Sequence, residues 1–121
     1  MPRARISGIA IDCPNAEALA TFYSQLLDIE LSSPDAFILS GEGDHQVEVW
    51  FQQVENYQPP TWPTQQRGQQ VHFDLEVDDR NAMIERATEL GATMADPNPG
   101  GSFTVMLDPA GHPFCLCDPA Q

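Results

Sequence analysis

The stretch Val-His-Phe-Asp-Leu-Glu-Val-Asp-Asp at residues 71–79 decides how the rest of the chain is interpreted. Hydrophobic side chains occupy every second position and alternate with His72, Asp74 and Glu76. This alternation is typical of a strand that has one face on an apolar core. The other face carries three side chains that can bind a metal ion or move a proton, although a solvated sheet face is the simpler interpretation.

A helix signal follows this strand directly. Asp79 is a favourable N-cap, hydrophobic side chains recur with helical spacing over 80–90, and Gly91 stands where helices end in a left-handed residue. Short strands are expected after it at 92–95, 103–107 and 113–117, with a β-turn at 108–111. The sequence from 71 to 119 therefore predicts a strand–helix–strand–strand–strand module.

The N-terminal half repeats this order. A strand is expected at 6–13, then Asn15 as N-cap, an amphipathic helix over 16–27 that Asp28 closes, strands at 29–32, 36–39 and 47–54, and a tight turn at 41–44. Aligning Asn15 with Asp79 places Gly8 at the position of His72. Two such βαβββ modules predict an α+β fold in which curved mixed sheets surround a shared cleft.

Residues 55–70 are rich in Pro and Gln and have no periodicity, which predicts a proline-stiffened connector. Its Tyr57 and Trp62 can lid a pocket, lie at a subunit contact or cover the edge of the core. We expect one domain over 1–121, with module one at about 5–54 and module two at about 71–119.

Composition narrows the classes of function. With 41% hydrophobic residues and no apolar run near about 18 residues, the chain predicts a cytoplasmic globular protein without a membrane span or signal peptide. Its net charge of −13, with five Arg and no Lys, argues against nucleic acid and favours cationic partners. The odd number of cysteines, three, argues against a disulfide framework.

Several local motifs add to the repeat. They are Ile11–Asn15 before a helix that holds Phe22-Tyr23, the helix exit Leu90-Gly91-Ala92, the segment Pro59–Pro63, and Asp108-Pro-Ala-Gly-His-Pro-Phe114 before an apolar strand. With these motifs the chain resembles, over about residues 5–119, the glyoxalase-like domains of the vicinal oxygen chelate superfamily. That superfamily includes glyoxalase I, extradiol dioxygenases, fosfomycin-resistance proteins and bleomycin-binding proteins.

The resemblance implies where a metal site would lie. Metal-dependent members take one ligand from the first and last strand of each module, which here implies Gly8, Gln52 or its neighbour Trp50, His72 and Cys115. Glycine supplies no ligand, whereas the imidazole of His72 and the thiol of Cys115 suit a divalent metal such as Zn, Fe, Ni or Mn. With Gln52 as a weak third ligand, the site is expected to be degraded. Cys117 makes a Cys-x-Cys pair with Cys115, which can bind a soft metal or act in redox exchange, or can be two small buried side chains.

Two classes of function follow from this resemblance. The first is a protein that binds a small molecule without chemistry, in a hollow beside His72 where the absent side chain of Gly8 opens room. Its expected pocket residues are Gly8, Trp50, His72, Trp62, Tyr57 and Cys117. The alternative is a metal-dependent lyase, isomerase or dioxygenase in which Glu76, Asp74 or Glu48 is the base. The sequence leaves open whether the protein is an enzyme, and the resemblance predicts a homodimer formed through the connector.

Overall fold

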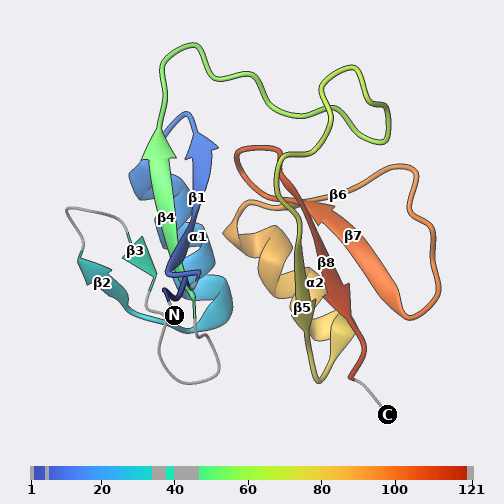
Figure 1. Cartoon of the computed structure of the whole chain (residues 1–121). Coiled ribbons are helices and arrows are strands. Elements are labelled where there is room, and N and C mark those ends of the chain that lie inside the picture. The colour runs from blue at the N-terminus through green and yellow to red at the C-terminus, as the bar shows by residue number, and fades with distance from the viewer. Residues whose placement is uncertain (1, 5, 34–37, 40–46, 120–121) are drawn as a thin grey trace. The chain divides into compact units, whose positions relative to one another are not determined.

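The computed structural model describes residues 2–4, 6–33, 38–39 and 47–119, so the turn expected at 41–44 lies outside the described residues. The chain forms two compact units, residues 1–57 and 58–121. Each unit holds one four-stranded mixed sheet and one helix, which confirms the predicted α+β fold of two βαβββ modules (Figure 1). Among the described residues, no helix has the length and apolar character needed to cross a membrane.

The first unit is built around a mixed sheet with the strand order β1-β4-β3-β2. Its elements are β1 (Gly8–Cys13), α1 (Ala16–Leu27), β2 (Leu31–Ser33), β3 (Ile38–Leu39) and β4 (Glu48–Gln53). The neighbours β1 and β4 run parallel, and the other neighbouring pairs are antiparallel. A parallel pair needs a crossover connection, which α1 and the two short strands supply.

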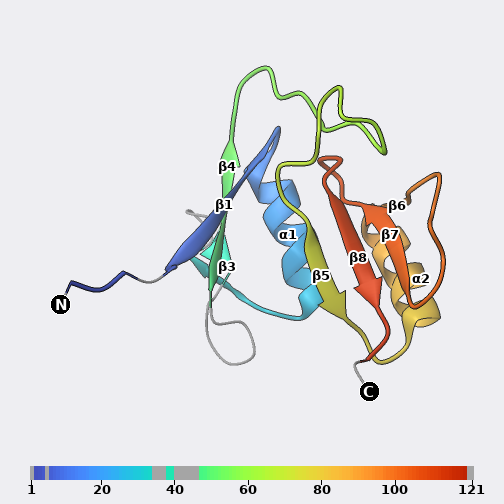
Figure 2. The ribbon, with the colours of Figure 1, turned by 45° about the vertical axis from the view of Figure 1, so that its right-hand side comes forward.

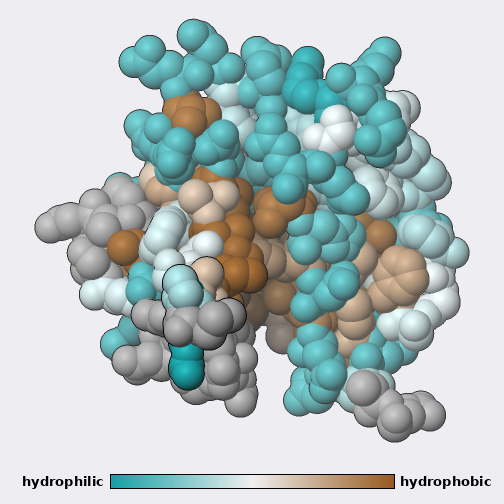
Figure 3. All heavy atoms as spheres, in the orientation of Figure 1, coloured by the Kyte–Doolittle hydropathy of each residue, from teal (hydrophilic) through white to brown (hydrophobic). Residues whose placement is uncertain are grey.

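Local sequence explains the bounds of α1. The Asn15 side chain accepts a hydrogen bond from the Ala18 N–H at 3.0 Å, and Asp28 takes the left-handed conformation that ends the helix. Helix α1 packs on one face of the sheet (Figure 2). Its Tyr23 stacks on Phe51 of β4 with ring centroids 5.8 Å apart. Hydrophobic side chains also reach the surface over this sheet (Figure 3).

The second unit has the same plan, with the strand order β5-β8-β7-β6. Its elements are β5 (Phe73–Glu76), α2 (Arg80–Leu90), β6 (Thr93–Met94), β7 (Phe103–Leu107) and β8 (Pro113–Cys117). Strands β5 and β8 are parallel, and α2 packs against β8 and β6. Met106, Phe114 and Leu116 are fully buried and form the centre of this unit's core.

The start of the second unit covers the sheet face opposite α2. The Trp62 ring packs against the buried cluster of Ala95, Val105 and Cys115, and its indole N–H donates to the Pro97 carbonyl at 3.0 Å. Three roles were expected for Trp62, and within this chain the ring covers the core.

The turn before β8 holds the same connector in place. The Asp108 carboxylate accepts from the N–H groups of Ala110 and His112, and Gly111 has φ of 91°. A Cβ at Gly111 would lie 2.9 Å from the Pro59 Cβ. The proline rings of the connector thus pack against a turn position that has no side chain.

Both helices have the predicted bounds, and both predicted N-caps are confirmed. Several strands are shorter than their patterns indicated. The first begins at Gly8 rather than residue 6, because pairing with β4 begins opposite Glu48. The strand expected at 71–77 spans Phe73–Glu76, because its ladder with β8 begins at Phe114.

Candidate metal centre in the second unit

Three potential metal ligands converge on the face of the second sheet opposite α2. The His72 Nε2 atom lies 3.0 Å from the Cys115 Sγ and 3.2 Å from an Asp74 carboxylate oxygen. The three ligand atoms all lie within 4.8 Å of one another. The sheet register explains this meeting, because Asp74 is the direct partner of Cys115 in the parallel β5–β8 pair and His72 precedes β5 on the same side.

The connector orients the imidazole of His72. The Gln69 side-chain oxygen lies 3.0 Å from the Nδ1 of His72, on the ring side opposite the thiol. An oxygen acceptor at Nδ1 requires the proton there, so the lone pair of the neutral ring is on Nε2, toward Asp74 and Cys115. Gln69 was not predicted from the sequence, because it lies in an aperiodic segment that gives no signal of side-chain direction.

The three side chains differ sharply in burial. Cys115 is 4% exposed, whereas the His72 side chain is 27% exposed and that of Asp74 is 74% exposed. Burial, together with the nearby Asp74 carboxylate, raises the pKa of the Cys115 thiol to about 11. Burial likewise raises the pKa of the Cys117 thiol. Both cysteines are free thiols, and in the absence of a bound cation they are protonated at neutral pH.

Comparison with known proteins identifies the family. The family model described as a glyoxalase-like domain matches residues 8–117. The chain belongs to the glyoxalase-like domain family. A search of curated proteins found no match.

Solved structures show the same fold for this glyoxalase-like protein. A glyoxalase/bleomycin resistance protein/dioxygenase family enzyme from Burkholderia phytofirmans is 16% identical with a TM-score of 0.69, over 95% of this chain and 98% of that one. A fosfomycin resistance protein from Mesorhizobium loti is 18% identical with a TM-score of 0.68, over 98% and 95%. The trypanothione-dependent glyoxalase I of Leishmania major is 12% identical with a TM-score of 0.62, over 96% and 87%.

The donor set of the second unit fits a divalent transition metal. Imidazole, carboxylate and thiolate are all zinc ligands, and ligand atoms of a tetrahedral zinc site lie roughly 3.5 Å apart. The two distances from Nε2, 3.0 and 3.2 Å, need to open by only about half an ångström to reach that spacing. With its proton on Nδ1, the neutral ring has no N–H to donate to the Asp74 carboxylate, whereas a metal ion bonds to all three donors.

The first unit has no comparable donor at the equivalent strand position. Gly8 pairs with Glu48 in the β1–β4 ladder, and a Cβ at Gly8 would lie 2.6 Å from the Trp50 ring. The Trp50 indole N–H donates to the Glu48 carboxylate at 2.9 Å. The room expected at Gly8 is therefore filled by the Trp50 ring, which lies against the strand where Gly8 has no side chain. This corrects the expectation of an open space at Gly8.

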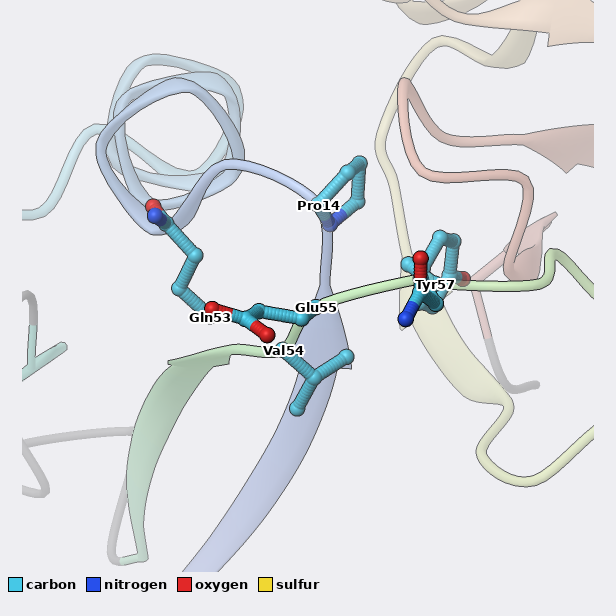
Figure 4. A pocket seen from close by; sticks show the side chains of 6 residues that line it. Pro14, Gln53, Val54, Glu55 and Tyr57 are labelled. Carbon is cyan, nitrogen blue, oxygen red and sulfur yellow. The ribbon is translucent and has the colours of Figure 1, made fainter.

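A separate depression of about 670 Å³ lies in the first unit, where β1 and β4 end (Figure 4). It is lined by Pro14, Gln53, Val54, Glu55, Asn56 and Tyr57. The Gln53 side-chain oxygen accepts from the Ala16 N–H at 3.2 Å, so this amide caps the start of α1. Tyr57 is the one predicted pocket residue among those that line the depression.

The remaining predicted site residues are divided between the units. Gln52, the expected weak ligand, is paired with Asp12 in the first unit, while His72 and Cys115 lie in the second. Glu76 and Cys117 are direct partners two ladder positions beyond Asp74 and Cys115. Asp74, which was expected to be a base, lies beside His72 and Cys115 and is itself a candidate metal ligand.

Proposed function

We propose that this glyoxalase-like protein binds a small molecule through a divalent metal ion held by His72, Asp74 and Cys115. The observation that supports this function most directly is the convergence of three ligand atoms of different chemistry within 4.8 Å. Three protein ligands leave a fourth position open, which is the composition of zinc sites that bind exogenous molecules. In this proposal Asp74 takes the place of the weak ligand Gln52 that the sequence suggested, so the site has three competent ligands.

Electrostatics and packing support the same function. One carboxylate and one thiolate balance the two positive charges of the ion, and the net charge of −13 raises the local concentration of cations. Asp74 and His72 are partly exposed, so a ligand can approach from their side, while Trp62 covers the side of Cys115. A bound metal ion would supply a Lewis acid for a molecule with two adjacent oxygen atoms.

Zinc binding tests the proposal in two steps. Calorimetry and elemental analysis should show about one zinc ion per wild-type chain, and His72→Ala should weaken binding at least about tenfold. Asp78→Asn, which removes an exposed carboxylate from the same segment, is the matched control and should bind zinc like the wild type. Acetohydroxamate, a chelator with two adjacent oxygens, should then bind the zinc-loaded protein and not the zinc-free protein. Equal zinc affinity of wild type and His72→Ala would overturn the proposal.

Glu76 supports catalysis as a second candidate function. It is exposed on the same strand face as Asp74, two residues further along β5 and so about 7 Å away, a distance suited to a base acting on a metal-bound molecule. Hydroxyacetone, which has adjacent oxygens and an enolisable C–H, is a suitable probe. Zinc-loaded wild type in D₂O should exchange this proton in NMR spectra and Glu76→Gln should not. Absence of exchange in the wild type would leave binding as the function.

The homodimer expected from the resemblance stays a prediction. Trp62 is already packed within its own unit, so the contact would have to use Tyr57 or the remaining surface of residues 55–70. Sedimentation equilibrium at micromolar concentration measures the oligomeric state directly, and a monomer would refute this prediction.

A further inference from the structure

The donor that distinguishes this metal centre is sulfur. Cys115 sits in the middle of β8, where its Cα partners are Asp74 on one side and Val105 on the other. Its side chain is 4% exposed and packs with Ala95 and Val105 under the ring of Trp62. The sulfur thus lies at the boundary between an apolar cluster and the polar group of His72 and Asp74.

We propose that the site selects thiophilic divalent ions, zinc and cobalt(II), over the hard ions magnesium, manganese and calcium, with Cys115 as a thiolate ligand. This inference rests on the metal site of the proposed function and adds the class of ion. On binding, a sulfur–metal bond forms, the S–H bond breaks, and the thiol proton leaves to solvent. The ion remains divalent, and no electron is transferred.

Ligand softness is the first reason for this selectivity. Thiolate and imidazole bind zinc, cobalt and copper well, whereas magnesium, manganese and calcium prefer carboxylates, carbonyls and water. In this set two of three donors, the Cys115 sulfur and the His72 nitrogen, belong to the first class. Asp74 alone offers the oxygen that a hard ion requires.

The surroundings of the donors give the second reason. Hard ions take six or more ligands and keep several waters, so they need space around the site. The side of Cys115 is closed by Ala95, Val105 and Trp62, which offer no oxygen ligand in their side chains. The Gln69 oxygen at Nδ1 also directs the Nε2 lone pair of His72 at the ion, which favours a compact tetrahedral arrangement.

Cobalt(II) spectroscopy tests the identity of the donor without reference to any activity. Titrating the zinc-free full-length protein with cobalt(II) should produce a near-ultraviolet thiolate-to-cobalt charge-transfer band and the visible bands of a tetrahedral ion. Cys115→Ser should lose the charge-transfer band. Cys117→Ser is the matched control, because this thiol lies on the same strand face two residues away, and it should keep the band.

Competition then tests selectivity. Zinc should displace cobalt at about one equivalent, whereas magnesium or manganese should require an excess on the order of a hundredfold or more. Cobalt binding by calorimetry without a charge-transfer band would overturn the inference and remove Cys115 from the ligand set, while binding of a small molecule through a metal ion at His72 would still stand. A band lost in Cys117→Ser and kept in Cys115→Ser would also overturn it, as would displacement by magnesium at comparable concentration. Failure of the wild type to bind either cobalt or zinc would refute the proposed function itself.

Discussion

The packing of the connector on the turn before β8 leads to a prediction about Gly111. This residue has φ of 91°, and an added Cβ would lie 2.9 Å from the Pro59 Cβ. Gly111→Ala therefore suffers left-handed strain of about 1–2 kcal/mol and an overpacked contact of about 1–3 kcal/mol. Reduced freedom of the unfolded chain offsets about 0.4–1 kcal/mol of this cost. We expect a net loss of about 2–3 kcal/mol in the free energy of unfolding.

Gly100→Ala is a matched control for the backbone strain. Gly100 has φ of 80°, and an added Cβ there would have no atom within 4 Å, so this variant should lose only about 1 kcal/mol. Urea unfolding of both variants, followed by circular dichroism, measures the difference. Because Pro59 is linked to Trp62 by a short segment, Gly111→Ala should also change Trp62 fluorescence. Equal losses in the two variants would show that the Pro59 contact places no constraint on residue 111.

Three further predictions concern stability. The raised pKa of Cys115, about 11, means that the unfolded chain ionises first as pH rises. Between pH 9 and 11 the wild type should therefore lose up to about 3 kcal/mol in the free energy of unfolding relative to Cys115→Ser, with little such loss below pH 9. Parallel pH profiles of the two proteins in urea unfolding would contradict this. Trp62→Phe keeps a ring on the apolar cluster but removes the hydrogen bond to the Pro97 carbonyl. We expect it to lower the free energy of unfolding by about 1–2 kcal/mol, and unchanged stability would mean that this hydrogen bond contributes nothing. Asp79→Ala should lower the free energy of unfolding by about 1 kcal/mol, because the Asp79 carboxylate caps α2. Asp78→Ala should leave the thermal midpoint nearly unchanged, so equal shifts in the two variants would refute the capping role.

The sequence by itself determined the helices and the order of the elements. Asn15 and Asp79 mark helix starts because a short polar side chain can bond a backbone N–H three residues ahead, which is a local interaction. The spacing of hydrophobic residues likewise fixed which face of each element is buried. The repeat of this order gave the two-module fold, and the alternation at 71–77 placed His72, Asp74 and Glu76 on one face.

The tertiary structure decided which of these side chains meet. His72 and Cys115 are 43 positions apart, and their contact depends on the register of β5 against β8, which no local pattern encodes. That same register places Asp74 beside the Cys115 thiol and Glu76 two ladder positions away. Shifting a ladder by one residue would turn each of these side chains to the other face, so the register was the deciding variable.

Loop residues and filled spaces were also decided by the tertiary structure. Gln69 lies in a segment without periodicity, so its contact with His72 depends on how the connector folds over the second sheet. The absence of a side chain at Gly8 suggested space for a ligand, but the Trp50 ring occupies that space. Close packing fills any space that a neighbouring side chain can reach, and that reach depends on rotamers and on strand partners. Hydrophobic periodicity specifies burial along one element, but it carries no information about which side chain from another strand lies opposite.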